Sequence, residues 1–508
     1  MEKLNLQTLE TKLWDCANVL RGELSSAEYK DYIFGMMFLK RMNDQFDLER
    51  ERLSGEYKAE GMDEGTIEEL LEEASLYDTF FVPQQARWAN LRDLNFDIGP
   101  ELDKAFKAIE DEPKNSELVG VLTTANYNNK ERVPDAKLVQ IIQIFDSIDL
   151  SNEGLEKPDI LGDAYMYLIK KFADDGGKKG GEFYTPEEVK ELVVKILKPQ
   201  ESDSIYDPTV GSAGFLINAI NYVKDQGGNY KNLQLFGQEI NLSTWAIAKL
   251  NMLLHEAKGA TIWKGDTIRD PKNKSGATLM TYDKVMANPP FSLKNWGKDV
   301  AKADEYNRFN YGVPPKSYGD YAFVEHMLAS LNSKGKMATV VPHGVLFRGS
   351  STRSEGKIRK QMLEDDLFEA VIGLPSNLFY GTGIPAAVII LNKDKPEEKK
   401  EKVLFIEASE CYEKDGNMNK LRVEDVDKII EAYDNFDDLE RFASVADLEE
   451  IRDNDYNLNI ARYVDTTVPE PEVDIEAVVS RIGEREEKLS KSKEEINGFL
   501  SELGFGRI

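Results

Sequence analysis

The chain has 508 residues, 41% hydrophobic and 31% charged, as expected for a folded protein of roughly two to four domains. It has no apolar run of about 18 residues and its N-terminus MEKLNLQTLETKLWD is polar, so we expect neither a membrane span nor a secretory signal. With only Cys16, Cys411 and three scattered histidines, we expect no disulfide framework and no metal site. A reducing cytoplasm is the predicted compartment.

Residues 1–150 are predicted to be helical. Closely spaced apolar residues continue one helix from Tyr29 to Met42, and Asp135–Ile148 carries a single apolar face. No catalytic constellation appears here, which indicates a packing or interaction module. We therefore place a first domain at 1–150, a second at 151–465 and a C-terminal segment at 466–508.

From about Gly180 to Ala408, short apolar runs alternate with helical stretches such as Gly214–Val223 and Ser243–Leu254. Strands that are buried on both faces and alternate with helices predict an α/β fold with a parallel, doubly wound, Rossmann-like sheet. Ligands of such sheets bind at the carboxyl ends of the strands, near the switch point. The expected strands are Ser204–Asp207, Leu233–Glu239, Ala260–Lys264, Lys284–Ala287, Lys336–Val341, Phe368–Ile372 and Ala386–Leu391.

Residues 409–465 are predicted to be mixed surface structure, and Pro469 and Pro471 mark a break. After the break an apolar residue recurs at every seventh position. This narrow stripe predicts a helical tail with a coiled-coil-like contact, made either with a partner subunit or with its own domain, and its terminal position favours the partner. The stripe consists of Ile475, Ile482, Leu489, Ile496 and Leu503.

A glycine-rich turn, DPTVGSAGF, runs from Asp207 to Phe215, between a strand and a helix. Its glycines let the backbone turn sharply and approach a ligand closely, although such a turn alone is equally consistent with a simple connection. Glu239 ends the next strand, where a carboxylate can bind both hydroxyls of a ribose or, alternatively, cap the following helix. Asp266 follows the third strand, where it can meet the amine of a bound adenine or serve only the turn.

The tetrapeptide Asn288-Pro289-Pro290-Phe291 follows the fourth strand. An amine conjugated to a purine ring is a poor nucleophile, because its lone pair is delocalised. Hydrogen bonds from its two N–H groups to the Asn288 amide oxygen and the Pro289 carbonyl would free that lone pair, and prolines hold the carbonyl in place. Phe291 offers a ring face for an unstacked base. An isolated Asn-Pro-Pro is more often a plain turn, but this position in a doubly wound sheet favours catalysis.

These motifs resemble those of amino-methylating DNA methyltransferases, and their order resembles the modification subunit (HsdM) of type I restriction-modification systems. The resemblance covers nearly the whole chain. Besides DPTVGSAGF and NPPF, it rests on GGEFYTP at 180–186, the segment Gly319–Glu325, VVPHGVLF, IGLPSNLF and NDYNLNIARYV.

The resemblance implies transfer of a methyl group from S-adenosylmethionine to N6 of adenine in DNA. The catalytic residues would be Asn288, Pro289, Pro290 and Phe291. The residues implied to bind the cofactor are Glu182, Phe183, Tyr184, Thr185, Pro186, Glu187, Asp207, Thr209, Gly211, Ser212, Ala213, Gly214, Glu239 and Asp266.

Three other functions fit parts of this pattern. Cytosine N4 methylation usually uses Ser at the position of Asn288, so Asn288 favours adenine. Methylation of a glutamine amide in a protein also uses an Asn-Pro-Pro-aromatic site, but the long N-terminal domain and the terminal helix argue against it. A catalytically silent scaffold in a DNA-bound complex would not need the intact motifs.

The net charge of −28 is unusual for a chain that binds DNA, because phosphate contacts supply most of the affinity for a duplex. Either the basic residues are confined to one cleft, or another subunit supplies most of the grip on DNA, and we expect both together. The resemblance implies that the other subunit is a specificity subunit (HsdS), with a second copy of this chain and in some systems a restriction subunit (HsdR). The candidate phosphate contacts, which are otherwise solvated loop charges, are Lys294, Lys298, Lys316 and Arg348.

Overall fold

The computed structural model describes residues 3–24, 26–77, 80–156, 160–164, 167–168, 171, 185–255, 257, 259–379, 382–416, 418–467 and 474–508. Two compact units make up the chain, residues 1–465 and 466–508. None of the described helices is both long enough and apolar enough to cross a membrane.

The N-terminal region is helical, as predicted. Its apolar side chains share one core with aromatic contacts, among them Phe46, which stacks on Tyr77 at 4.6 Å between ring centroids. Its helices are α1 (Leu6–Leu20), α2 (Ser26–Ala59), α3 (Glu64–Leu70), α4 (Trp88–Leu91), α5 (Ile98–Asp111) and α6 (Asp135–Asp146).

Helix α10 (Leu242–Leu254) joins this helical region to the sheet that follows. Ala246, Ile247 and Leu250 lie in the N-terminal core, whereas Ala248 and Met252 lie in a core of the sheet. Near the start of α10, the Ser243 hydroxyl donates to the Asp31 carboxylate of α2 at 2.8 Å. The two regions therefore share buried surface.

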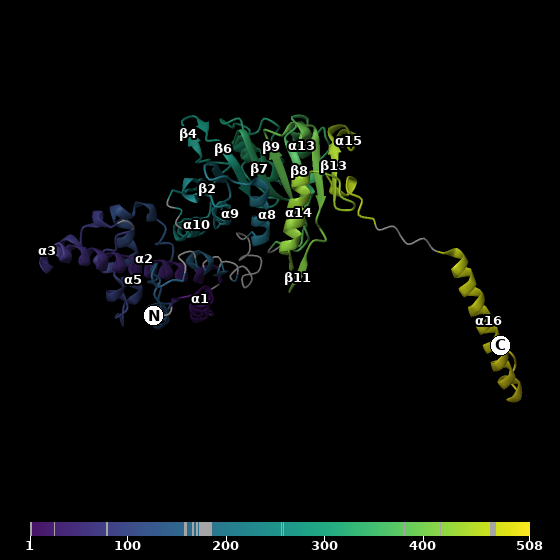
Figure 1. Cartoon of the computed structure of the whole chain (residues 1–508), viewed down its shortest axis with the longest axis horizontal. Coiled ribbons are helices and arrows are strands. Elements are labelled where there is room, and N and C mark those ends of the chain that lie inside the picture. The colour runs from purple at the N-terminus through teal and green to yellow at the C-terminus, as the bar shows by residue number, and fades with distance from the viewer. Residues whose placement is uncertain are drawn as a thin grey trace. The chain divides into compact units, whose positions relative to one another are not determined.

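A nine-stranded sheet forms the centre of the first unit, in the order β13-β10-β8-β9-β7-β6-β1-β2-β3 (Figure 1). Strand β1 (Ser204–Asp207) pairs in parallel with β2 (Gln234–Glu239) on one side and with β6 (Tyr282–Ala287) on the other. Because β3 (Thr261–Lys264) lies beyond β2, the chain builds outward from β1 and then returns to its other side. The strand order therefore reverses between the neighbours β1 and β6, which is the switch point of the sheet. The predicted doubly wound, Rossmann-like sheet is confirmed.

The sheet is mixed, and the prediction of a purely parallel sheet was wrong for Ala386–Leu391. Strand β9 (Ala386–Asn392) runs antiparallel to both β7 (Leu331–Pro342) and β8 (Phe368–Gly373). The described part of the β8–β9 connection contains no helix, and a chain without a crossover helix returns antiparallel.

Two further strands of the nine-stranded sheet were not predicted. Strand β10 (Lys402–Glu407) pairs in parallel with β8, and β13 (Ala443–Asp447) pairs antiparallel with β10 at the sheet edge. The interpretation of residues 409–465 as surface structure therefore missed an edge strand. An antiparallel edge strand with one half-buried side, as in β13, lacks the continuous apolar run that marks the central strands.

Helices cover both faces of the sheet. Helices α8 (Glu187–Leu197), α9 (Gly214–Asp225) and α14 (Val423–Asn435) pack on one face, and α12 (Asp320–Ala329) and α13 (Ser354–Glu364) on the other. Alternate strand residues supply the two cores, so Ala370 and Ile372 of β8 face the first layer and Val371 the second. The shorter elements are β4 (Lys274–Ser275), β5 (Thr278–Leu279), α11 (Lys298–Ala301), β11 (Glu413–Asp415), β12 (Met418–Lys420) and α15 (Leu448–Asp453).

The second unit contains one helix, α16 (Ile475–Glu502), as predicted for the tail (Figure 1). Asp474 caps it by accepting a hydrogen bond from the Ala477 N–H at 2.9 Å. No residue of the helix is buried. The predicted stripe is exposed, with Ile475 at 71% and Leu489 at 57% of full exposure.

Candidate active site at the carboxyl edge of the sheet

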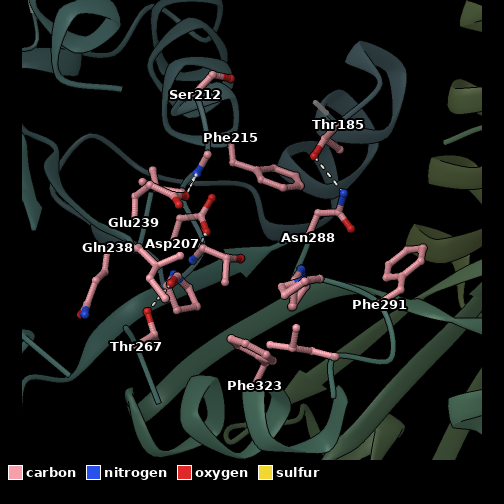
Figure 2. A pocket seen from close by; sticks show the side chains of 18 of the residues that line it. Thr185, Asp207, Ser212, Phe215, Gln238, Glu239, Thr267, Asn288, Phe291 and Phe323 are labelled. Carbon is pink, nitrogen blue, oxygen red and sulfur yellow. Dashed lines mark hydrogen bonds between the residues drawn. The ribbon is translucent and has the colours of Figure 1, made fainter. Parts of the chain in front are cut away.

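A cavity of about 820 Å³ opens at the switch point, where the strands β1, β2, β3 and β6 end. Its lining brings together four sequence motifs that are separated by up to 84 residues of chain, from Asp207 to Phe291 (Figure 2). The glycine turn, Glu239, Asp266 and the tetrapeptide beginning at Asn288 all contribute. The sequence therefore predicted a ligand site at this edge of the sheet, from the motifs that follow the expected strands.

Two residues of the glycine turn have a left-handed backbone conformation. Gly211 has φ of 53° and Ala213 has φ of 67°, and Ala213 precedes the first residue of α9. This left-handed geometry costs little at glycine and turns the chain sharply out of β1. The Gly211 N–H donates to Glu239 Oε2 at 3.1 Å, so the turn is tied to the end of β2.

Two carboxylates, Asp207 and Glu239, are nearly fully buried at one side of this cavity. Burial raises the pKa of Asp207 to about 8, and the nearby Glu239 carboxylate contributes to the rise. Burial also raises the pKa of Glu239, although the N–H groups of Asn241 and Gly211 oppose that change. Two buried acids stabilise a cation placed between them, so this side of the cavity is suited to a positively charged ligand.

Asn288 lies at the other side of the cavity, at the end of β6 (Figure 2). Its Nδ2 donates to the Thr185 hydroxyl at 3.1 Å. Its Oδ1 is buried and has no hydrogen-bond partner within the described ranges. A buried acceptor without a partner costs free energy unless a ligand satisfies it, so the geometry points to a ligand that donates a hydrogen bond here.

Phe291 completes the tetrapeptide wall and meets an aromatic ring from the β8–β9 connection. The rings of Phe291 and Phe379 contact edge to face, with centroids 5.7 Å apart and an interplanar angle of 66°. Phe379 was not among the predicted site residues, although the segment IGLPSNLF that contains it carried the resemblance. The other lining residues that were not predicted as site residues include Lys190, Gln238, Leu293, Trp296, Phe323, Pro342 and Ile384.

The predicted cofactor residues divide into three groups. Thr185, Asp207, Thr209, Gly211, Ser212, Gly214, Glu239 and Asp266 line the cavity. Pro186, Glu187 and Ala213 are described but do not line the cavity. The Glu187 carboxylate instead accepts a hydrogen bond from Asn218 and pairs with Lys190. Glu182, Phe183 and Tyr184 lie outside the described residues, so their role stays a prediction.

Asp266 has a structural role in its own loop. Its Oδ1 accepts hydrogen bonds from the N–H groups of Ile268 and Arg269, both at 2.9 Å. The neighbouring Thr267 hydroxyl donates to the Pro208 carbonyl at 2.5 Å. The end of β3 is thereby attached to the glycine turn, which fixes the cavity floor between them.

The four basic residues predicted to contact phosphates differ in their surroundings. Lys294 and Lys316 are exposed and Lys298 is half-exposed. Arg348 instead binds buried acids: Nη2 lies 2.5 Å from Asp320 Oδ2 and 3.0 Å from Glu355 Oε1. The other oxygen of Asp320 accepts from the Ser292 N–H at 2.8 Å, directly after Phe291. Arg348 therefore stabilises the turn that carries the tetrapeptide, whatever its contact with DNA.

A doubly wound sheet with an Asn-Pro-Pro-Phe turn beside its glycine turn is the architecture of the amino-methylating methyltransferases. Two family models match the chain: that for the N-6 DNA methylase over residues 156–471 and that for the HsdM N-terminal domain over residues 9–145. The chain belongs to the N-6 DNA methylase family of type I modification subunits, which are adenine-specific DNA methyltransferases.

Known relatives support this assignment. The type I restriction enzyme MjaVII methylase subunit of Methanocaldococcus jannaschii is 38% identical over 76% of this chain and 66% of its own length. The HindI methylase subunit of Haemophilus influenzae is 31% identical over 84% of this chain and all of its own length. The solved methyltransferase subunit of a type I system from Streptococcus thermophilus is 33% identical, with a TM-score of 0.79 over 91% of this chain and 100% of that one.

Replacement of Arg348 tests its structural role. Arg348→Ala leaves the buried carboxylates of Asp320 and Glu355 without their cation, so we expect the free energy of unfolding to fall by about 3 kcal/mol. Lys294→Ala, at an exposed lysine of the adjacent loop, should leave it unchanged. Urea denaturation of both variants measures the difference, and equal stabilities would show that Arg348 does not support the turn.

Proposed function

We propose that this cavity binds S-adenosylmethionine next to an adenine turned out of duplex DNA, and that the chain methylates N6 of that adenine. The observation that carries the proposal is the Oδ1 of Asn288, which is buried in a cavity shared with the glycine turn and has no hydrogen-bond partner among the described residues. An adenine amine has two N–H donors, which matches such an acceptor.

The chain's residues would act on the amine by position rather than by proton transfer. Asn288 Oδ1 and the Pro289 carbonyl accept the two N–H groups, so the nitrogen becomes more tetrahedral and its lone pair points toward the cofactor side. S-adenosylmethionine, when bound, would supply the methyl group, its S–C bond breaking as the N–C bond forms. The target nitrogen, then cationic, would release a proton to solvent. The face of Phe291, braced by Phe379, supports the unstacked ring.

The opposite side of the cavity would hold the cofactor. The carboxylate of Glu239 accepts the ribose hydroxyls, and the buried acids Asp207 and Glu239 favour the positive charge of the sulfonium and the α-ammonium group. The backbone of Gly211 and Ser212 allows close approach of the ligand. Asp266, which lines the cavity, would contact the adenine ring of the cofactor. The segment 182–187 contributes through Thr185, which lines the cavity.

We further propose that a specificity subunit reads the DNA sequence and that α16 docks on helices of that subunit. The exposed stripe of α16 is unsatisfied apolar surface on an otherwise charged helix, and such seams pack against other helices. Delegated recognition also accounts for the net charge of −28. Lys294, Lys298 and Lys316 would contact phosphates around the target base, and a second copy of this chain would complete the modification complex.

Asn288→Ala tests the catalytic assignment. Since the side chain faces the amine and not the cofactor, we expect the methylation rate to fall about 100-fold or more while S-adenosylmethionine affinity stays nearly unchanged. Asn310→Ala, at an exposed asparagine of the loop after the tetrapeptide, is the control and should keep full activity. Transfer of labelled methyl groups to DNA and calorimetric binding measure the two quantities, and an equal loss of cofactor affinity would contradict the assignment.

The pH dependence of cofactor affinity tests the role of Asp207. Its pKa of about 8 means that the side chain is largely protonated at pH 7, and a cationic ligand binds the ionised form more tightly. Affinity should therefore rise by about tenfold per pH unit below pH 8 and level off above it, with proton release on binding. Asp207→Asn should abolish this slope. Calorimetry in buffers of different ionisation enthalpy counts the protons, and a flat profile in the wild type would refute the role.

The docking role of α16 is tested by one residue on each side of the helix. Leu489→Glu places a charge in the apolar stripe and should weaken assembly with the specificity subunit, as should deletion of residues 473–508. Lys491→Glu reverses a charge about 200° around the helix and should not. Both point variants should bind S-adenosylmethionine with the affinity of the wild type. Co-expression followed by size-exclusion chromatography measures assembly, and an intact complex with the deletion would exclude this role.

A further inference from the structure

The amide of Asn288 has two ends of nearly equal size but opposite chemistry. Oδ1 accepts hydrogen bonds, whereas Nδ2 only donates them. An adenine amine also presents donors, so an amide turned by 180° would place donor against donor and oppose attack. Catalysis by this residue therefore requires a contact that distinguishes the two ends.

The Thr185 hydroxyl is that contact in the structure. It accepts a hydrogen bond from Asn288 Nδ2 at 3.1 Å, and Oδ1 stays buried in the cavity with no partner in the part of the chain that the structure describes (Figure 2). The two residues are 103 positions apart in the sequence. We propose that Thr185 is a positioning residue, which fixes the rotation of the Asn288 amide so that Oδ1 faces the target amine. This inference rests on the proposed methylation of adenine.

Neighbouring packing holds Thr185 in place. The residue lies two positions before the start of α8, and α8 packs on β6, the strand that ends beside Asn288. Lys190 of α8 is buried, and its side chain lies against Gly214, where an added Cβ would come within 2.8 Å of Lys190 Cδ. The start of α8 is therefore held in a fixed position relative to both the tetrapeptide and the glycine turn.

The hydroxyl also links the amide to the rest of the cavity. While Thr185 Oγ1 accepts from Asn288, its own proton is available to a ligand in the cavity that Thr185 lines. A hydroxyl that has donated its proton to such a ligand can only accept from Asn288. Occupation of the cofactor side would then lock the amide in the orientation that receives the adenine.

A role in positioning differs measurably from a role in cofactor affinity alone. Thr185→Val keeps the shape of the side chain and removes the hydroxyl, while Thr185→Ser keeps the hydroxyl. If Thr185 orients Asn288, Thr185→Val lowers the single-turnover methylation rate by about tenfold, the factor that one net hydrogen bond is worth. Thr185→Ser restores most of the rate. A residue that serves only cofactor affinity would instead raise the Kd and leave the rate at saturation unchanged.

The experiment uses the full chain co-expressed with the specificity subunit of its own system. Single-turnover transfer of labelled methyl to duplex DNA is measured at saturating S-adenosylmethionine, with cofactor and DNA affinities measured separately. A reduced rate for Thr185→Val with serine rescue supports the proposal. An unchanged rate at saturation, or a serine variant as slow as the valine variant, overturns it. A wild-type complex that labels no adenine overturns the proposed function itself.

Discussion

The reversal of strand order between β1 and β6 is the constraint on which the site depends. Strands β2 and β3 are added on one side of β1, and β6 is added later on the other side. The connections after β1 and β6 therefore diverge, and a cavity remains between them at the carboxyl edge of the sheet. The turn after β1 and the turn after β6 border that cavity from its two sides. One turn is built for close backbone approach, and the other presents a rigid, proline-fixed acceptor pair. Sheet topology alone brings a cofactor surface and a nucleobase surface within reach of each other.

The polar groups in the cavity are costly to the protein without a ligand. Asp207 is buried with a raised pKa, and Asn288 Oδ1 and Thr209 Oγ1 are buried without partners in the described ranges. Such groups are usually satisfied, because an unpaired buried polar atom costs about 1–3 kcal/mol. These three groups line one cavity, which fits a site whose electrostatics are arranged for a bound cation and a hydrogen-bond donor. The supporting networks, such as that of Asp320 and Arg348, are by contrast fully paired.

Sequence reasoning predicted the central strands and the motifs that border the cavity, because both follow from local signals. Strands buried on both faces, such as β1, are continuous apolar runs, and a motif that ends such a run is placed at a known edge of the sheet. The walls contributed by distant segments were harder to predict. Phe323 lies on α12 and Phe379 on the β8–β9 connection, and although both segments carried the family resemblance, neither sequence shows that its aromatic ring reaches the cavity. The ion pairs of Arg348 were missed because a sequence shows the charge of a side chain but not its partners.

The antiparallel direction of β9, a strand that was predicted at Ala386–Leu391 but as a parallel one, has a consequence for the site. In a fully parallel sheet, the connection after β8 would cross to the opposite edge before the next strand began. Because β9 runs backwards, it starts at the edge where β8 ends, and the segment between them stays at the carboxyl edge. That segment carries Phe379, Thr382 and Ile384 into the cavity lining, and Phe379 against Phe291. One reversed strand thus supplies the aromatic wall that a turn of four residues after β6 could not form alone.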